Sequence, residues 1–223
     1  MSKPVYFRDV AKSPVAELSL CHGAGAPADS AFMAELSAEL VARNINVTRF
    51  ELDYMAQRRH GGAKRPPPKV VVLQQEWLEL LNEDTFALSA KLPTYLGGKS
   101  MGARLACMVS TAETLLQKPN GVIAYGYPFH PQNKPEKLRL APLQATVEKQ
   151  VPTLIVQGTR DPFGKEAEVK DYELPQGIEW AWLSTGDHDF KPLKSSGKNQ
   201  SQLISDAAAA TRKFIDEQIK AAH

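Results

Sequence analysis

The sequence Gly98-Lys99-Ser100-Met101-Gly102 follows a mostly apolar run, Leu92–Gly97, and precedes a helical pattern, Ala103–Leu116. Where a strand turns directly into a helix, glycines let the backbone and the neighbouring side chains approach without clashing. Such a turn exposes the serine hydroxyl at the N-terminus of the helix, where developing negative charge is favoured. The motif alone is weakly specific, and a glycine-rich turn with an inert serine is the alternative. The flanking strand and helix favour Ser100 as a nucleophile.

Outward from this turn, short apolar runs alternate with longer helical patterns, which is typical of a mostly parallel sheet built from βα units. Runs that are apolar throughout are expected where helices cover both faces of the sheet. The expected strands are Ala16–Cys21, Asn46–Leu52, Thr94–Gly97, Gly121–Tyr125, Thr153–Gln157 and Glu179–Leu183, with a weaker edge strand at Val5–Arg8. The expected helices are Ala31–Arg43, Lys69–Leu81, Met101–Leu116 and Gln202–Lys220. The pattern predicts an α/β fold with about six to seven strands.

Length and composition fit one globular domain over residues 1–223, because the chain is 43% hydrophobic and 23% charged. A net charge of +2 is too small to indicate binding to nucleic acid or to a membrane surface. No apolar window approaches the roughly 20 residues that span a bilayer. The first residues, MSKPVYFRDVAKSP, lack the apolar run of a signal peptide, so a cytoplasmic location is expected. The two cysteines, Cys21 and Cys107, are expected to be buried thiols.

The segment Cys21-His22-Gly23-Ala24-Gly25-Ala26-Pro27 follows the first strong strand. Small residues after a strand let main-chain N–H groups approach a substrate oxygen, as in the oxyanion-hole loops of serine hydrolases. The expected donors are the amides of Ala24 and Met101. His22 and Gly25 are candidates for the substrate pocket, and a histidine that braces the loop is the preferred interpretation of His22.

A carboxylate and a histidine follow the next two strands. Asp161 lies in Gly158-Thr159-Arg160-Asp161-Pro162, and His188 lies in Gly186-Asp187-His188-Asp189-Phe190. The carboxylate would hold the histidine tautomer and stabilise the imidazolium. A plain Asp-Pro turn and a surface-loop histidine are the alternatives, and Asp171 is a weaker acid candidate inside an expected helix. The order serine, acid, histidine is that of the α/β-hydrolases.

Taken together, the segments HGAGAP, GKSMG, GYPFHP, LIVQGTRDPFG and GDHDF resemble an α/β-hydrolase-like domain family. That family includes testis-expressed protein 30 and the third regulatory subunit of the non-specific lethal acetyltransferase complex, and dienelactone hydrolases are more distantly similar. The resemblance covers nearly the whole chain. It implies an α/β-hydrolase fold with Ser100, Asp161 and His188 at the triad positions. It leaves the substrate open, because some relatives serve as subunits of complexes.

The residues predict acyl transfer from a small ester or thioester to water, with no metal or cofactor. No insertion of the size of a lipase lid follows Gly126. Two loops should lie at the carboxyl edge of the sheet, Tyr54–Pro68 and Tyr127–Arg139. The basic residues Arg58, Arg59, Lys64 and Arg65 would favour anionic substrates, although a solvated basic loop is the more common arrangement. Candidates for the substrate pocket on the second loop are Tyr127, Phe129 and His130, and a turn that packs its own aromatic side chains is equally compatible.

The competing hypothesis is a hydrolase-fold module that binds a protein or a small ligand without turnover, because a fold does not fix a function. A protein partner is compatible with the sequence but is not indicated by any motif. Three dispersed residues of the types that a triad needs favour the enzyme, since a scaffold has no reason to keep them.

Overall fold

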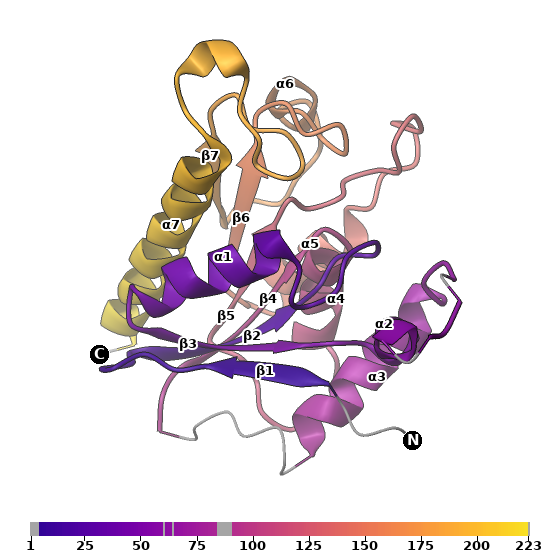
Figure 1. The fold of residues 1–223 in the computed structure, drawn as a ribbon, viewed down its shortest axis with the longest axis vertical. Helices are drawn as coiled ribbons and strands as arrows, with labels where there is room; N and C mark the ends of the chain where they lie inside the picture. The colour runs from indigo at the N-terminus through magenta and orange to yellow at the C-terminus, as the bar shows by residue number, and fades with distance from the viewer. Residues whose placement is uncertain (1–4, 60, 64, 84–90, 223) are drawn as a thin grey trace.

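The computed structural model describes residues 5–59, 61–63, 65–83 and 91–222. One sheet runs through the molecule, with helices on both of its faces (Figure 1). The strands are β1 (Tyr6–Asp9), β2 (Ala16–Cys21), β3 (Ile45–Phe50), β4 (Thr94–Lys99), β5 (Gly121–Tyr125), β6 (Thr153–Gly158) and β7 (Ile178–Leu183). The helices are α1 (Ala31–Val41), α2 (Asp53–Arg59), α3 (Val70–Asn82), α4 (Met101–Ser110), α5 (Ala141–Glu148), α6 (Glu166–Val169) and α7 (Gln200–Ala221), with a short 3₁₀ turn at Lys194–Ser196.

The strand order is β1-β3-β2-β4-β5-β6-β7, and every neighbouring pair is parallel except β1 with β3. Because β3 and β4 lie on opposite sides of β2, the direction of strand addition reverses there. Open α/β sheets bind ligands outside the carboxyl ends of the strands at such a reversal. The loop after β2 and the turn after β4 both leave the sheet at this point. The prediction of a mostly parallel sheet with about six to seven strands is confirmed by the seven-stranded sheet.

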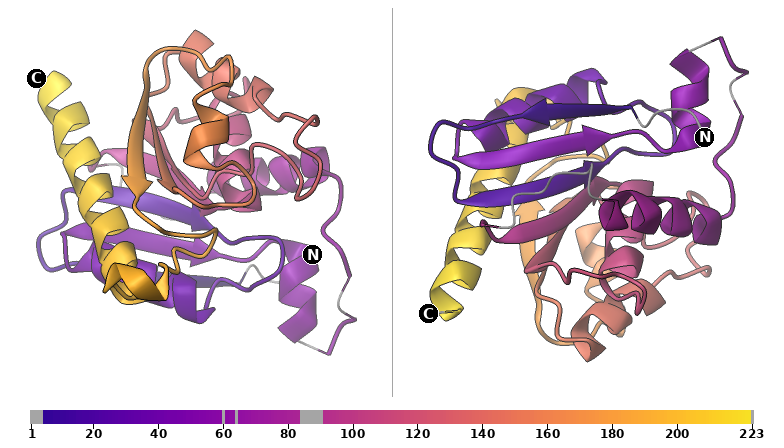
Figure 2. Two further views of the ribbon diagram at one scale, coloured as in Figure 1. Left: turned by 90° about the horizontal axis from the view of Figure 1, so that it is seen from above. Right: turned by 90° about the horizontal axis from the view of Figure 1, so that it is seen from below.

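Each face of the sheet has its own apolar core. Helices α1 and α7 cover one face, and α3, α4 and α5 cover the other (Figure 2). Along β5 the side chains alternate between the two cores: Val122 and Ala124 pack toward α4, whereas Ile123 and Tyr125 pack toward α7. Strands that are covered in this way bury both faces, which explains why most of their sequences are mainly apolar rather than cleanly alternating.

Helix α4 ends at Ser110 rather than at the predicted Leu116. The hydroxyl groups of Ser110 and Thr111 both donate to the carbonyl of Cys107, at 2.9 and 3.1 Å. Such bonds from a serine or threonine back to the preceding turn compete with continuation of the helix.

Helices α2 and α5 were not predicted, and the helix expected around Asp171 ends before that residue. Helix α2 lies at the start of the segment Tyr54–Pro68 that was predicted to be a loop, and Lys64 of that segment lies outside the described residues. Helix α5 contains Pro142 in its first turn, where proline is favoured because the amide that it lacks would have no partner there. Helix α6 is a single turn that ends at Val169, so the expectation that Asp171 lies inside a helix is wrong.

Both cysteines are free thiols and are buried, as predicted. Burial raises the pKa of the Cys21 thiol well above its ordinary value and that of the Cys107 thiol to about 12. No helix within the described ranges has the length and apolar character needed to cross a membrane.

Candidate active site

Ser100 occupies the turn between β4 and α4 with φ 55° and ψ −109°. A positive φ is uncommon for a residue with a side chain and costs on the order of 1–3 kcal/mol, so the surrounding structure must hold it. The Ser100 amide donates to the carbonyl of Tyr125, and the Ser100 carbonyl accepts from the amide of Arg104. These bonds fix the serine to the end of β5 and to the first turn of α4.

The glycines that flank Ser100 are required by close backbone contacts. A Cβ atom on Gly98 would lie 2.2 Å from the carbonyl carbon of Gly102. A Cβ atom on Gly102 would lie 2.5 Å from the carbonyl oxygen of Cys21. Both distances are far inside van der Waals contact, so the tight turn and its packing against the end of β2 exclude any side chain at either position.

Asp161 and His188 form a hydrogen-bonded pair where β6 and β7 end. The Nδ1 atom of His188 lies 2.8 Å from Oδ2 of Asp161, and the carboxylate is fully buried. The two loops are joined by backbone bonds from Thr159 to Leu183 and from Arg160 to Gly186. Because Nδ1 donates to the carboxylate, Nε2 of His188 is left as the acceptor, which is the tautomer that a general base needs.

Two further groups hold the Asp161 carboxylate. The side-chain amide of Gln157 donates to Oδ2 at 2.9 Å, and the backbone amide of Phe163 donates to Oδ1 at 2.9 Å. The Phe163 ring also packs on the imidazole of His188, with ring centroids 4.4 Å apart. With three donors, the carboxylate is fixed in one orientation, and so is the histidine that it binds.

Gly126 links His188 to the serine turn. A Cβ atom on Gly126 would lie 3.4 Å from both Cε1 and Nδ1 of His188, and Gly126 directly follows Tyr125, whose carbonyl accepts the Ser100 amide. The structure therefore brings Ser100, Asp161 and His188 to the same edge of the sheet, around the end of β5.

The loop after β2 lies beside the serine. A Cβ atom on Gly23 would be 4.0 Å from Cβ of Ser100. The hydroxyl of Tyr54 donates to the carbonyl of Ala24 at 3.1 Å and so holds the loop from α2. Within the part of the chain that is described, neither the Ala24 amide nor the Met101 amide donates to another protein group. Two free N–H groups near the serine are what an oxyanion hole requires.

His22 is fully buried and braces this loop. The Leu52 amide donates to Nε2 of His22 at 3.2 Å, so Nδ1 carries the proton and donates to the carbonyl of Gly23 at 2.6 Å. The preferred bracing interpretation agrees with these contacts, and both ring nitrogens are occupied by the protein. Burial lowers the pKa of His22, so the folded protein holds the imidazole neutral.

This neutral imidazole should make stability depend on pH. The unfolded chain binds the His22 proton at a higher pH than the folded chain, so the free energy of unfolding should fall as the pH drops below about 6.5. Gln at position 22 does not titrate and can still accept from the Leu52 amide. In urea unfolding at pH 8 and pH 5.5, His22→Gln should lose less stability between the two values than wild type. An equal loss would contradict this account.

Lys99 directly precedes the serine and is a buried cation that the sequence did not reveal. Its Nζ lies 3.7 Å from Oδ1 of Asp189 and 5.5 Å from the centroid of the Phe32 ring. Burial lowers the pKa of Lys99 to about 8, against the opposing effect of Asp189. The ion pair joins the end of β4 to the loop that carries His188.

The aromatic residues after β5 pack within the protein. The Tyr127 hydroxyl donates to the carbonyl of Arg139 at 2.7 Å, and the buried Phe129 ring stacks on Trp180 at 6.1 Å between centroids. His130 is also buried, with Nε2 3.7 Å from a carboxylate oxygen of Glu168. Of the two alternatives for this loop, these contacts favour a turn that packs its own aromatic side chains over a substrate pocket lined by Tyr127, Phe129 and His130.

The arginines of α2 are also engaged. Arg59 binds both carboxylate oxygens of the buried Glu51, at 2.7 and 2.5 Å, and pairs with Asp29 at 2.7 Å. Arg58 lies over the Tyr54 ring at 5.3 Å and donates to the carbonyl of Arg65. Arg59 is thus a structural residue, and the prediction that it contacts substrate is not supported by its partners. Gly25 is exposed on the loop after β2.

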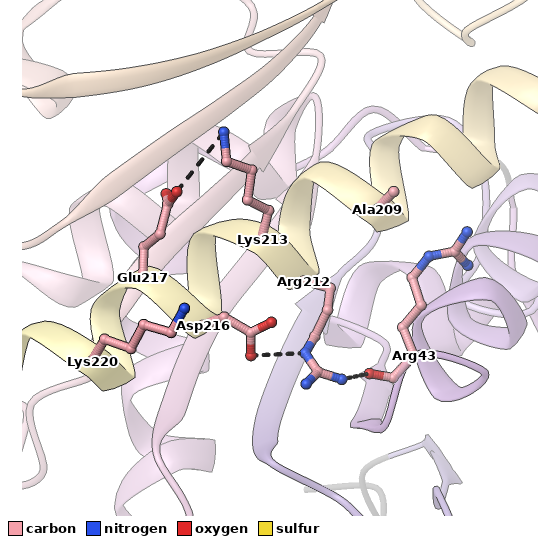
Figure 3. A pocket seen from close by; sticks show the side chains of 7 residues that line it. All are labelled: Arg43, Ala209, Arg212, Lys213, Asp216, Glu217 and Lys220. Carbon is pink, nitrogen blue, oxygen red and sulfur yellow. Dashed lines mark hydrogen bonds and ion pairs between the residues drawn. The ribbon is translucent and has the colours of Figure 1, made fainter.

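A surface hollow of about 390 Å³ lies elsewhere, along α7 (Figure 3). It is lined by Arg43, Ala209, Arg212, Lys213, Asp216, Glu217 and Lys220. None of these residues belongs to the turn or the loops that carry the three predicted catalytic residues. Its charges pair with one another, as in Arg212 with Asp216 at 2.9 Å. Across the described ranges, no group of three or more His, Cys, Asp or Glu side chains is arranged to hold a metal ion.

Comparison with known proteins agrees with this fold. Residues 14–216 match the family model described as Alpha/beta hydrolase domain. No curated protein sequence matches the chain. Among solved structures, an alpha-beta serine hydrolase homologue from Coxiella burnetii is 17% identical with a TM-score of 0.62, over 94% of this chain and 88% of that one.

Two further structures show the same fold. A serine hydrolase without a lid from Xanthomonas campestris is 15% identical with a TM-score of 0.60, over 96% of this chain and 87% of its own. Dienelactone hydrolase from Anabaena variabilis is 14% identical with a TM-score of 0.67, over 95% and 90% of the two chains. At these identities the likeness concerns the fold alone.

Proposed function

Because this chain belongs to the α/β-hydrolase domain family, we propose that it is a serine hydrolase that cleaves a small ester or thioester through an acyl-enzyme on Ser100. The observation that carries the proposal is the hydrogen-bonded pair of the buried Asp161 and the partly exposed His188, which lies at the same sheet edge as a serine held at positive φ. A strained backbone that several contacts maintain is typical of functional sites.

In the proposed reaction, Nε2 of His188 takes the proton of the Ser100 hydroxyl as Oγ attacks the carbonyl carbon. Asp161 stabilises the imidazolium that forms, and the amides of Ala24 and Met101 donate to the oxyanion of the tetrahedral intermediate. His188 then gives its proton to the leaving alcohol or thiol. A water molecule, deprotonated by His188, attacks the acyl-enzyme and releases the acid, which restores the serine.

The short connection from β5 to α5 supports an open site. The segment packs its own aromatic side chains against α6 and β7, as the contacts of Phe129 with Tyr172 and Trp180 indicate. Ser100 itself is partly exposed, which also supports an open site. The similarity to a hydrolase described as having no lid points in the same direction. We therefore expect short, soluble acyl substrates to reach Ser100 without interfacial activation.

A fluorophosphonate probe tests the enzyme against the binding module. It phosphonylates a serine only where a base and an oxyanion hole activate the hydroxyl. Intact-mass spectrometry should show one adduct on wild type and none on Ser100→Ala. Ser201→Ala, which changes an exposed serine on α7, should be labelled like wild type. A folded wild type without adduct would contradict the enzyme and favour the module.

A further inference from the structure

The side chain of Lys99 lies between two loops of the candidate site. Lys99 is the last residue of β4, and 8% of its side chain is exposed. Its Cγ atom lies beside the loop after β2, 3.8 Å from the position of a Cβ atom on Gly23. Its Nζ atom reaches the end of β5, 3.3 Å from the position of a Cβ atom on Gly126. One buried side chain therefore contacts the loop after β2 with its stem and the end of β5 with its charge.

The ammonium group of Lys99 is a near neighbour of the His188 imidazole. The same Cβ position on Gly126 lies 3.4 Å from both Nδ1 and Cε1 of His188, so both groups approach one point. The Nζ atom also pairs at 3.7 Å with Oδ1 of Asp189, the residue that follows His188. The cation thus contacts the segment whose position decides where Nε2 of His188 points.

This segment has a strained backbone. Thr185 and Phe190, on either side of His188, both have φ 61°, which is uncommon for residues with side chains. The buried Phe190 ring meets the edge of Phe32 at 5.3 Å between centroids, and Phe32 in turn lies 5.5 Å from Nζ of Lys99. A strained loop keeps its shape only where surrounding contacts hold it, and the contacts of Lys99 are among them.

A buried ammonium group is an expensive way to fill space. Its removal from water costs free energy that an ion pair returns only in part when the partner is 55% exposed, as Asp189 is. Methionine has a similar length and flexibility and would pack there without this cost. Stability alone therefore does not explain a lysine at this position.

The groups that face the ammonium are the carboxylates of Asp161, Asp187 and Asp189 and the imidazole of His188. Asp161 binds the imidazole, and the other two acids are the sequence neighbours of His188. The charge of Lys99 is therefore balanced, and the imidazolium that forms in the proposed reaction lies among carboxylates as well as beside a cation.

We propose that Lys99 is a positioning residue: its ammonium group, through the ion pair with Asp189, fixes the segment that carries His188 relative to the serine turn. The inference rests on the proposed function, since it assigns a role at the same site. Lys99 touches no reacting atom and acts through the orientation of the base. A misplacement of about 1 Å is enough to lower a rate about 100-fold.

Lys99→Met removes the charge and keeps the length of the side chain. It should lower kcat for p-nitrophenyl butyrate about 10- to 100-fold and leave KM within about twofold of wild type. Its resistance to urea should equal or exceed that of wild type, because a buried charge is lost and Asp189 can be hydrated. Asp189→Asn should lower kcat by a similar factor, and the double variant should lose little more than either single variant.

Lys191→Met is the matched control. Lys191 also pairs with Asp189, at 3.9 Å, but 61% of its side chain is exposed. This variant should hydrolyse the ester like wild type. Wild-type kcat in Lys99→Met, or an equal loss in Lys191→Met, would overturn the proposal.

The pH dependence separates positioning from packing. Burial lowers the pKa of Lys99 to about 8, so the ammonium carries its charge below this pH and loses it above. In wild type, kcat should therefore fall as the pH rises above about 8. Lys99→Met has no charge to lose, and its kcat should stay level over the same range. An alkaline fall that is equal in both proteins, or absent from both, contradicts a role for the charge.

The outcomes distinguish this inference from the proposed function. If wild type hydrolyses the ester and Lys99→Met does so equally well, the hydrolase stands and the positioning role is wrong. If folded wild type hydrolyses no ester, the proposed function fails, and hydrogen exchange of the peptide 184–193 then tests whether Lys99 holds the segment. Faster deuterium uptake in Lys99→Met than in wild type and Lys191→Met supports it, and equal uptake in all three overturns it.

Discussion

Ser100→Ala is expected to lower kcat for hydrolysis of short p-nitrophenyl esters by about a million-fold, close to the background rate. Removing the hydroxyl removes the atom that forms the acyl-enzyme, while the oxyanion hole and the binding contacts remain. Initial rates of wild type, Ser100→Ala and His188→Ala check the expectation, and the two variants should lose similar amounts because the residues act as one unit.

The backbone of Ser100 offers a control that separates chemistry from strain. Alanine at φ 55° should keep the strain and the stability of wild type, whereas glycine adopts positive φ freely. Ser100→Gly should therefore be as inactive as Ser100→Ala but more stable to urea by about 1 kcal/mol. Near-wild-type activity in folded Ser100→Ala would refute Ser100 as the nucleophile.

Asp161→Asn is expected to lower kcat about ten-thousand-fold with little change in KM. The carboxylate accepts from three donors: His188 and Gln157 at Oδ2 and the amide of Phe163 at Oδ1. In asparagine, an NH₂ group replaces one of the two carboxylate oxygens. At that position, the NH₂ donor would face the N–H donor of a neighbouring group. If the NH₂ group takes the Oδ2 position, His188 must accept at Nδ1 and carry its proton on Nε2, which prevents it from acting as a base.

Asp171 provides the matched control for this substitution. It is exposed beyond the end of α6, and it was the alternative acid in the sequence analysis. Asp171→Asn should hydrolyse p-nitrophenyl esters like wild type. A large loss of kcat in Asp171→Asn together with an active Asp161→Asn would reverse the assignment of the acid.

The sheet was predictable because each of its main strands is a short, mostly apolar run in the sequence. The run at β5 is apolar throughout, those at β2 and β6 are mostly apolar, and each ends in glycine or in a polar loop. The missed helices lacked comparable signals: α2 is short and lies in a segment rich in arginine and glycine, and α5 carries a proline that resembles an interruption. Helix ends depend on individual hydroxyl groups such as that of Thr111, which no periodicity shows.

The candidate triad was predictable from chain order, since each of its three residues follows a separate strand. The groups around it were not, because their roles depend on contacts between distant segments. Lys99 meets Asp189, and Gln157 meets Asp161, only after the strands have paired. Gln157 did leave a signal, a polar residue that ends the apolar run Leu154–Val156. No sequence signal predicts the ion pairs of Arg59 with Glu51 and Asp29. The arginine-rich sequence around Arg59 favoured a side chain that contacts solvent or substrate.

The strand order also has a consequence for synthesis on the ribosome. After β4, each new strand (β5, β6 and β7) pairs with the strand translated just before it, so this half of the sheet can grow as the chain emerges. The face beneath α1 is different. Its apolar residues pack against α7, which follows every strand in the sequence. Until α7 has been made, only α1 covers this face of the nascent sheet, so the part that later packs against α7 is where we expect a chaperone to bind.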